Sequence, residues 1–189
     1  IGTAPADITG HGRIDIGVLY NPAPSPAIDS RPLFEDALCF VARRQKGTAA
    51  RALALRDLPR YPLIIPSRPH AIRMLVETRL AALGLKPQVA MEIDAVSAIL
   101  ELVAEGHGFA VLSPRALDGA DVARRLASRP IVRPRLASTI AIAVSAQRPS
   151  TPLQQAAVAL IEEAARRTMA PSRRRITEQR NRHERGDTN

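Results

Sequence analysis

Aromatic residues and lysines are scarce in this chain. Its 189 residues include three Phe, two Tyr and no Trp, so the predicted core is aliphatic. The only lysines are Lys46 and Lys86, and the formal net charge of +9 therefore comes from arginine. Arginine in place of lysine, together with abundant alanine, is also typical of GC-rich coding. The positive charge alone is therefore weak evidence for binding to nucleic acid.

The single cysteine, Cys39, excludes an internal disulfide. It lies in the apolar run 38–41, which predicts a buried thiol in a reducing compartment. The sequence also contains no run of 18 apolar residues and no signal-peptide pattern. We therefore expect a cytoplasmic protein without a membrane partner.

Motifs for metal binding, cofactor binding and catalysis are missing. The four histidines are scattered, and none belongs to an HExxH or CxxC context: His11, His70, His107 and His183. No phosphate-binding glycine loop and no GxSxG nucleophile motif occurs. The acids Asp15, Glu35 and Asp36 have no evident acid–base partner. We therefore expect no catalytic residues, no metal, no cofactor and no enzymatic activity.

Short apolar strands alternate with amphipathic helices along most of the chain. Strands are predicted at residues 13–20, 37–42, 63–65, 88–93, 109–112, 131–132 and 137–144, and helices at 52–58, 67–83, 95–105 and from 152 onward. This alternation predicts an α/β protein with a mainly parallel sheet and helices on both faces. Ser67, Asp94 and Ser113 would then meet at the carboxyl edge of the sheet, where such folds bind ligands.

The stretch LIIPSRPH at residues 63–70 is the most informative part of the chain. The pattern predicts a buried strand that passes directly into a helix, with Ser67 as N-cap and Pro69 in the first turn. Two interpretations of Ser67 and Arg68 are open. They could bind a small anion together with the free N–H groups of the helix. Alternatively, Ser67 only caps the helix and Arg68 only faces water.

Several stretches together resemble the C-terminal effector-binding domain of LysR-type transcriptional regulators. They are GRIDIGV at 12–18, PLFED at 32–36, LIIPSR at 63–68, VAMEID at 89–94, ILELVAEGHG at 99–108 and QRPS at 147–150. The run at 63–70 is similar to the nitrogen-assimilation-control-like branch of that family. Each stretch alone is only weakly specific for the family. Their order and spacing over residues 13–165 make the resemblance strong.

The resemblance implies a fold like the type 2 periplasmic binding proteins. Such a fold has two α/β lobes joined by two crossover strands, here expected at 37–42 and 137–144. The implied organisation is a partial first lobe at 1–38, a second lobe at 39–143, a return to the first lobe with the last helix at 144–170, and a basic disordered tail at 171–189. The helix expected before the strand at Asp15 is not recognisable, so we expect an N-terminally truncated chain with an incomplete first lobe.

The resemblance also implies a function. The domain would bind a small, anionic effector in the interlobe cleft and would form homo-oligomers in the intact protein. DNA would be bound by a helix-turn-helix domain missing from this chain. The expected effector-binding residues are Ser67, Arg68, Tyr20, Asn21, Asp94 and Ala95. The alternative is an extracytoplasmic solute-binding protein of the same fold.

The arginine-rich tail supports only a minor role in DNA binding. Residues 171–189 contain no aromatic side chain on which a base could stack. We therefore expect at most weak, salt-sensitive contacts with phosphates through Arg173–Arg175.

Overall fold

The computed structural model describes residues 14–45 and 51–169 of the chain. The chain divides into two compact units, residues 1–149 and 150–189, which are described separately. The predicted tail at 171–189 and the segment before Ile14 lie outside the described residues. None of the described helices is long and apolar enough to cross a membrane.

Helix α4 (Pro152–Met169) belongs to the second unit and begins where the sequence predicts. The hydroxyl of Thr151 accepts a hydrogen bond of 3.1 Å from the backbone N–H of Gln154, which satisfies one free donor of the first turn. Farther along α4, Glu163 pairs with Arg166 at 3.0 Å and with Arg167 at 4.0 Å.

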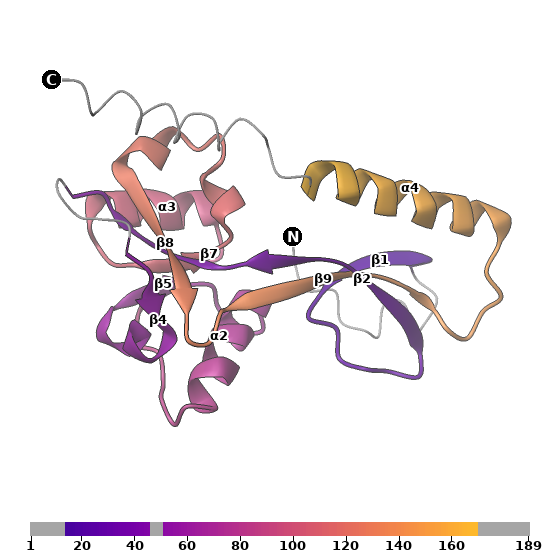
Figure 1. The fold of residues 1–189 in the computed structure, drawn as a ribbon, viewed down its shortest axis with the longest axis horizontal. Helices are drawn as coiled ribbons and strands as arrows, with labels where there is room; N and C mark the ends of the chain where they lie inside the picture. Colours follow the sequence, from indigo (N-terminus) through magenta and orange to yellow (C-terminus); the bar gives the residue numbers. More distant parts are fainter. Residues whose placement is uncertain (1–13, 46–50, 170–189) are drawn as a thin grey trace, which may run out of the picture. The chain divides into compact units, whose positions relative to one another are not determined.

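The first unit contains a small and a large group of strands (Figure 1). Its strands are β1 (Ile16–Tyr20), β2 (Ile28–Ala37), β3 (Cys39–Arg43), β4 (Leu53–Ala54), β5 (Leu63–Ile65), β6 (Val89–Glu92), β7 (Ala110–Leu112), β8 (Leu126–Val132) and β9 (Ala137–Ser145). Its helices are η1 (Leu55–Arg60), α2 (Ala71–Ala81), α3 (Val96–Glu105), η2 (Pro114–Leu117) and η3 (Asp121–Arg125), where η marks a 3₁₀ helix.

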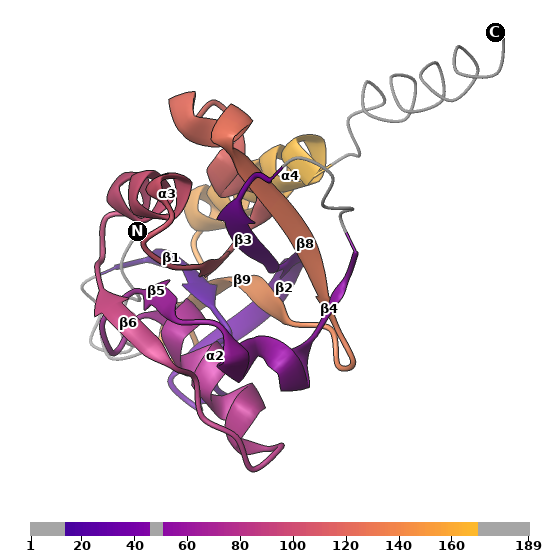
Figure 2. The same cartoon turned by 90° about the vertical axis from the view of Figure 1, so that its left-hand side faces the viewer.

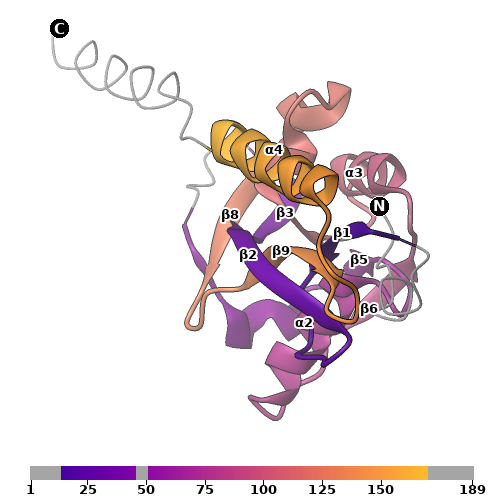
Figure 3. The same cartoon turned by 90° about the vertical axis from the view of Figure 1, so that its right-hand side faces the viewer.

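The small sheet has β9 in its centre, with β1 and β2 antiparallel on either side (Figure 3). A compact apolar cluster of Leu19, Ile28 and Ala143 links the three strands. Strand β2 was not predicted over its full length. Most of its first half is exposed and contains Arg31 and Pro32, so it lacks the apolar pattern of a buried strand.

The large sheet has the order β4-β8-β3-β7, and a bridge between Leu63 and Phe109 connects it to the pair β5-β6. Strand β3 is antiparallel to both β7 and β8, whereas β4 with β8 and β5 with β6 are parallel. The expected mainly parallel sheet is therefore wrong for the small sheet, whose strands are antiparallel. It is confirmed for the large sheet with β5 and β6, in which every described strand except β3 runs in the same direction. The chain enters this sheet through β3 and leaves it through β8, and these two neighbours run in opposite directions.

Two crossover connections join the sheets and lie side by side (Figure 1). Ala37 pairs with Ala137, and the backbone N–H of Leu38 donates a 2.9 Å hydrogen bond to the carbonyl oxygen of Leu136. The expected fold of two α/β lobes joined by two crossover strands is confirmed. The lobe boundaries at 38/39 and 143/144 remain a prediction.

Alternation along the strands of the large sheet produces two apolar cores. Phe40 on β3 and Val111 on β7 face the core that contains Val76 and Leu80 of α2. Their strand neighbours Cys39, Val41, Ala110 and Leu112 face the opposite core, which contains Ile99 and Val103 of α3. Helices α2 and α3 accordingly cover opposite faces of the strands (Figure 2). Because both faces of β3 and β7 are buried, the sequences of these strands are continuously apolar at 39–42 and 110–112.

The helix ends are partly as predicted. Helix α3 ends at Gly106, whose φ of 93° suits glycine. The N-cap predicted at Ser67 is wrong, because α2 is capped by His70. The N-cap of α3 is Ala95, the residue after Asp94. The predicted helix at 52–58 is instead the short strand β4 followed by the 3₁₀ helix η1.

We predict that Gly108→Ala destabilises the large sheet. A Cβ atom at Gly108 would lie 2.9 Å from Cγ1 of Ile64 and 3.0 Å from the carbonyl oxygen of Pro62. Because Ile64 is buried, the backbone must shift, which should lower the free energy of unfolding by about 1–3 kcal/mol. Urea unfolding measures this change. The exposed variant Ser97→Ala on α3 is the control, and equal stability of both variants would contradict the close approach.

We predict that the protein loses stability as the pH falls, because His70 caps α2 in its uncharged form. His70 accepts a 3.2 Å hydrogen bond at Nδ1 from the backbone N–H of Ile72, and burial lowers the pKa of its imidazole. The stabilising contribution is therefore present above the ordinary histidine pKa and is lost as the pH falls from that value through the lower pKa of the folded protein.

The control for this prediction is His70→Asn, which keeps a capping side chain that does not titrate. Thermal unfolding of the parent between pH 7.5 and 5, a range that brackets the ordinary pKa of about 6.5, should show a steeper loss of stability than that of His70→Asn. Identical slopes would show that His70 does not control the cap.

Candidate functional site

A cavity of about 220 Å³ opens between the small sheet and the helices of the large sheet. Tyr20 at the end of β1 and Ser138 in β9 line it from the small sheet. His70 before α2, Val96 of α3 and Ser113 after β7 line it from the large one. The remaining lining residues are Asp36, Leu38, Ala71, Ile72, Leu112 and Ala116. The cavity therefore lies in the predicted interlobe cleft.

Two serine hydroxyls lie on opposite sides of this cavity. Oγ of Ser138 accepts a 2.8 Å hydrogen bond from Nδ2 of Asn21, and Oγ of Ser113 accepts a 3.3 Å bond from the backbone N–H of Arg115. Among the described residues, no acceptor takes the hydrogen of either hydroxyl. Both hydroxyls can therefore donate to a ligand.

Asp36 and His70 contribute a carboxyl group and an imidazole to the lining of this cavity, beside the phenol of Tyr20. The lowered pKa of His70 results first from burial, which disfavours the imidazolium, while the charge of Asp94 acts in the opposite direction. At neutral pH the imidazole is therefore mainly uncharged, with Nδ1 committed to the helix cap. Asp36 supplies a carboxylate that can accept hydrogen bonds.

A second hollow of about 390 Å³ adjoins the cavity and shares Tyr20 and Ala71 with it. Asn21 lines this hollow in a left-handed conformation, with φ 48°. Besides its bond to Ser138, its Oδ1 accepts a 2.8 Å bond from the backbone N–H of Thr139. Asn21 thus fixes the end of β1 against β9.

Ser67 and Asp94 bind each other. The carboxylate of Asp94 accepts hydrogen bonds from the backbone N–H of Ser67 at 2.9 Å and from its hydroxyl at 2.7 and 2.8 Å. These bonds lower the pKa of Asp94, the bond from the hydroxyl most of all. The donors predicted for an effector anion are therefore occupied by an anion of the chain itself. Ala95 follows Asp94 as the N-cap of α3.

Arg68 pairs with Glu77 on α2 and lines neither hollow. Its guanidinium donates two hydrogen bonds of 2.9 Å to the two carboxylate oxygens. Glu77 also accepts a 2.5 Å bond from the buried Arg73, which pairs with Glu92 at 3.1 Å. The hydrogen bond from Arg68 is the largest cause of the lowered pKa of Glu77. The structure thus places Arg68 in a surface ion pair with Glu77 rather than facing water alone.

The sequence did not identify His70, Ser138 or Asp36 as residues of this cleft. Ser113 gave a partial signal, because Ser-Pro after an apolar strand predicts a cap at the carboxyl edge, and its side chain does cap η2. In residues 14–45 and 51–169, no cluster of three or more His, Cys, Asp or Glu side chains is arranged to hold a metal ion.

Comparison with known proteins gives consistent matches. The model of the LysR substrate binding domain family matches residues 2–166. The HTH-type transcriptional regulator BbuR of Bordetella bronchiseptica is 32% identical over 104 residues, which cover 54% of this chain and 32% of BbuR. The nitrogen assimilation regulatory protein nac of Klebsiella aerogenes is 29% identical over 122 residues, covering 63% of this chain and 39% of that protein.

Solved structures show the same fold. The effector-binding domain of QuiR, solved in complex with shikimate, superimposes with a TM-score of 0.69 at 16% identity and covers 87% of this chain and 79% of that one. The matches with BbuR and nac span 32% and 39% of the lengths of these regulators, well under half of each. Because the family model covers most of the sequence, the chain belongs to the LysR substrate-binding domain family.

Proposed function

We propose that this domain senses a small anionic metabolite in the 220 Å³ cavity and thereby modulates DNA binding by the regulator that carries it. The observation that carries the proposal is the pair of serines, Ser113 and Ser138, that line one cavity from the large and the small sheet. A carboxylate accepts hydrogen bonds from both hydroxyls and so bridges the two sheets. The complex of QuiR with shikimate supports a carboxylate ligand in this fold.

Asp36 narrows the chemistry of the effector. Its carboxylate repels a simple anion but accepts a hydrogen bond from a ligand hydroxyl. A neutral His70 adds no positive charge to offset Asp36 at neutral pH. The combination favours a hydroxylated carboxylate over a bare dicarboxylate.

The effector would act through the angle between the lobes. The backbone contact between Leu38 and Leu136 is where the two crossovers meet, and a ligand that contacts both lobes stabilises one arrangement of them. In an intact homo-oligomeric regulator, this arrangement would position the DNA-binding domains. Tyr20 contacts the effector directly in this proposal, and Asn21 holds Ser138 in place.

We predict that Ser138→Ala and Ser113→Ala each weaken effector binding. Each removes one donor to the carboxylate, which should lower affinity about tenfold. An NMR titration with hydroxylated carboxylates, with shikimate as the first probe, measures the affinity. Ser97→Ala, an exposed serine on α3, is the control, and unchanged affinity in both cavity variants would refute the bridging role.

If an effector anion binds at Ser67, we predict that Ser67→Ala and Asp94→Ala change the affinity for that anion in opposite directions. The carboxylate of Asp94 occupies the donors of Ser67, so its removal should strengthen anion binding, whereas Ser67→Ala and Arg68→Ala should weaken the effector response. In an intact homologue that carries these residues, effector-dependent DNA binding is the measurement and basal DNA binding the control.

The same comparison tests the structural interpretation. If Ser67 and Asp94 only hold the two loops together, both Ser67→Ala and Asp94→Ala weaken the response. If Ser67→Ala and Arg68→Ala both respond like the parent, the anion does not bind at the entry to α2.

A further inference from the structure

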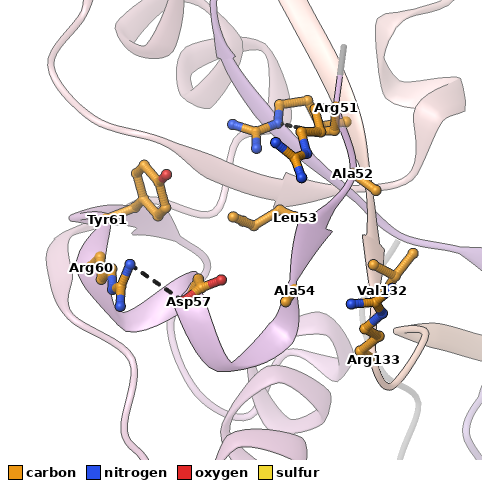
Figure 4. Close-up of a pocket in the computed structure, with 10 residues that line it drawn as sticks. Arg51, Ala52, Leu53, Ala54, Asp57, Arg60, Tyr61, Val132 and Arg133 are labelled. Carbon is orange, nitrogen blue, oxygen red and sulfur yellow. Dashed lines mark hydrogen bonds and ion pairs between the residues drawn. The ribbon is translucent and has the colours of Figure 1, made fainter. Parts of the chain in front are cut away.

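A third hollow, of about 420 Å³, lies at the edge of the large sheet and shares no residue with the cleft hollows. Four arginines line it: Arg51, Arg60, Arg129 and Arg133. In Figure 4, Arg51 lies at the top, Arg60 at the left and Arg133 at the right, with Leu53 between them. Four separate parts of the fold therefore bring a guanidinium to one space.

The pairing of β4 with β8 explains part of this convergence. These strands are parallel, with Leu53 opposite Ile131, so the same register continued backward places Arg51 beside Arg129. Nε of Arg129 donates a 2.5 Å hydrogen bond to the carbonyl oxygen of Arg51, and Cζ of its guanidinium lies 5.7 Å from the ring centroid of Phe40. Arg129 is thus anchored while its terminal nitrogens remain available to donate.

The positive charges in this hollow are poorly compensated. Asp57 is the acid among the lining residues, and it pairs with Arg60 at 3.5 Å. No carboxylate among the described residues forms an ion pair with Arg51, Arg129 or Arg133. Like charges held close together repel one another, and a bound anion relieves that repulsion.

Arg133 occupies a backbone position that does not favour an arginine. It follows β8 with φ 59°, a left-handed conformation that glycine adopts at little cost. The chain nevertheless has at this turn a side chain that adds a fourth guanidinium to the hollow.

We propose that this hollow binds a small multivalent oxyanion through phosphoryl or carboxylate groups. Guanidinium groups recognise both through paired hydrogen bonds, and the volume lies within the usual range for small-ligand pockets. The arginines surround one space rather than form a line along the surface, which favours a compact anion over a nucleic-acid backbone. The site is independent of the effector cavity.

The test is an NMR titration of the full chain at constant ionic strength, with inorganic pyrophosphate as the phosphoryl probe and citrate as the carboxylate probe. We expect saturable shifts of the amides at 51–54, 60–61 and 129–133 with at least one probe, and the tighter probe identifies the preferred group. The double variant Arg51→Gln/Arg133→Gln should weaken binding about tenfold or more. Circular dichroism and thermal unfolding check that it folds.

Arg56→Gln is the matched control, because Arg56 is exposed on the same short helix as Arg60 but does not line the hollow. It should change affinity less than about twofold, as expected for a screened surface charge. An equal loss in Arg56→Gln would show diffuse charge attraction and overturn the proposal. So would shifts confined to Arg173–Arg185 or to the cleft, or displacement of the anion by a DNA duplex that shifts the same amides.

Discussion

The contact between the two crossover connections is the constraint on which the rest of the structure depends. The backbone bond from Leu38 to Leu136, together with the pairing of Ala37 with Ala137, holds the chain where it passes from one sheet to the other. On one side of this point, β2 and β9 extend the small sheet. On the other side, β3 and β8 form the centre of the large sheet. The cleft exists because both connections cross at the same place.

The polar residues at the entrance of α2 show how the chain satisfies its own charges. Ser67 donates to Asp94, while Arg68 and Arg73 share Glu77. The sequence predicted Ser67, Arg68 and Asp94 as effector-binding residues, yet each has a partner within the fold. The donors that line the cleft cavity include neutral hydroxyls from the two sheets, and a neutral donor needs no compensating charge when the cavity is empty.

The arginine-lined hollow differs from the cleft in this respect. Its charges come from β8, from the turn after it, from η1 and from the segment before β4, and they have one lining acid between them. Because these arginines are spread along the sequence from Arg51 to Arg133, the sequence pattern does not indicate that they form a cluster. A chain with a net charge of +9 offers many arginines, and strand pairing decides which of them converge.

The sequence by itself determined the elements whose pattern is local: the buried strands around Leu63 and Val111, the stripe of α3 with Gly106 at its end, and the start of α4 at Thr151. Together with the family resemblance, it also predicted two lobes and two crossovers. Only the tertiary structure decided the direction of β3 against β8, the cap of α2 at His70 and the partners of Ser67 and Arg68. The physical reason is that apolar periodicity records which face of an element is buried, whereas a polar side chain takes whichever partner folding brings within hydrogen-bonding distance.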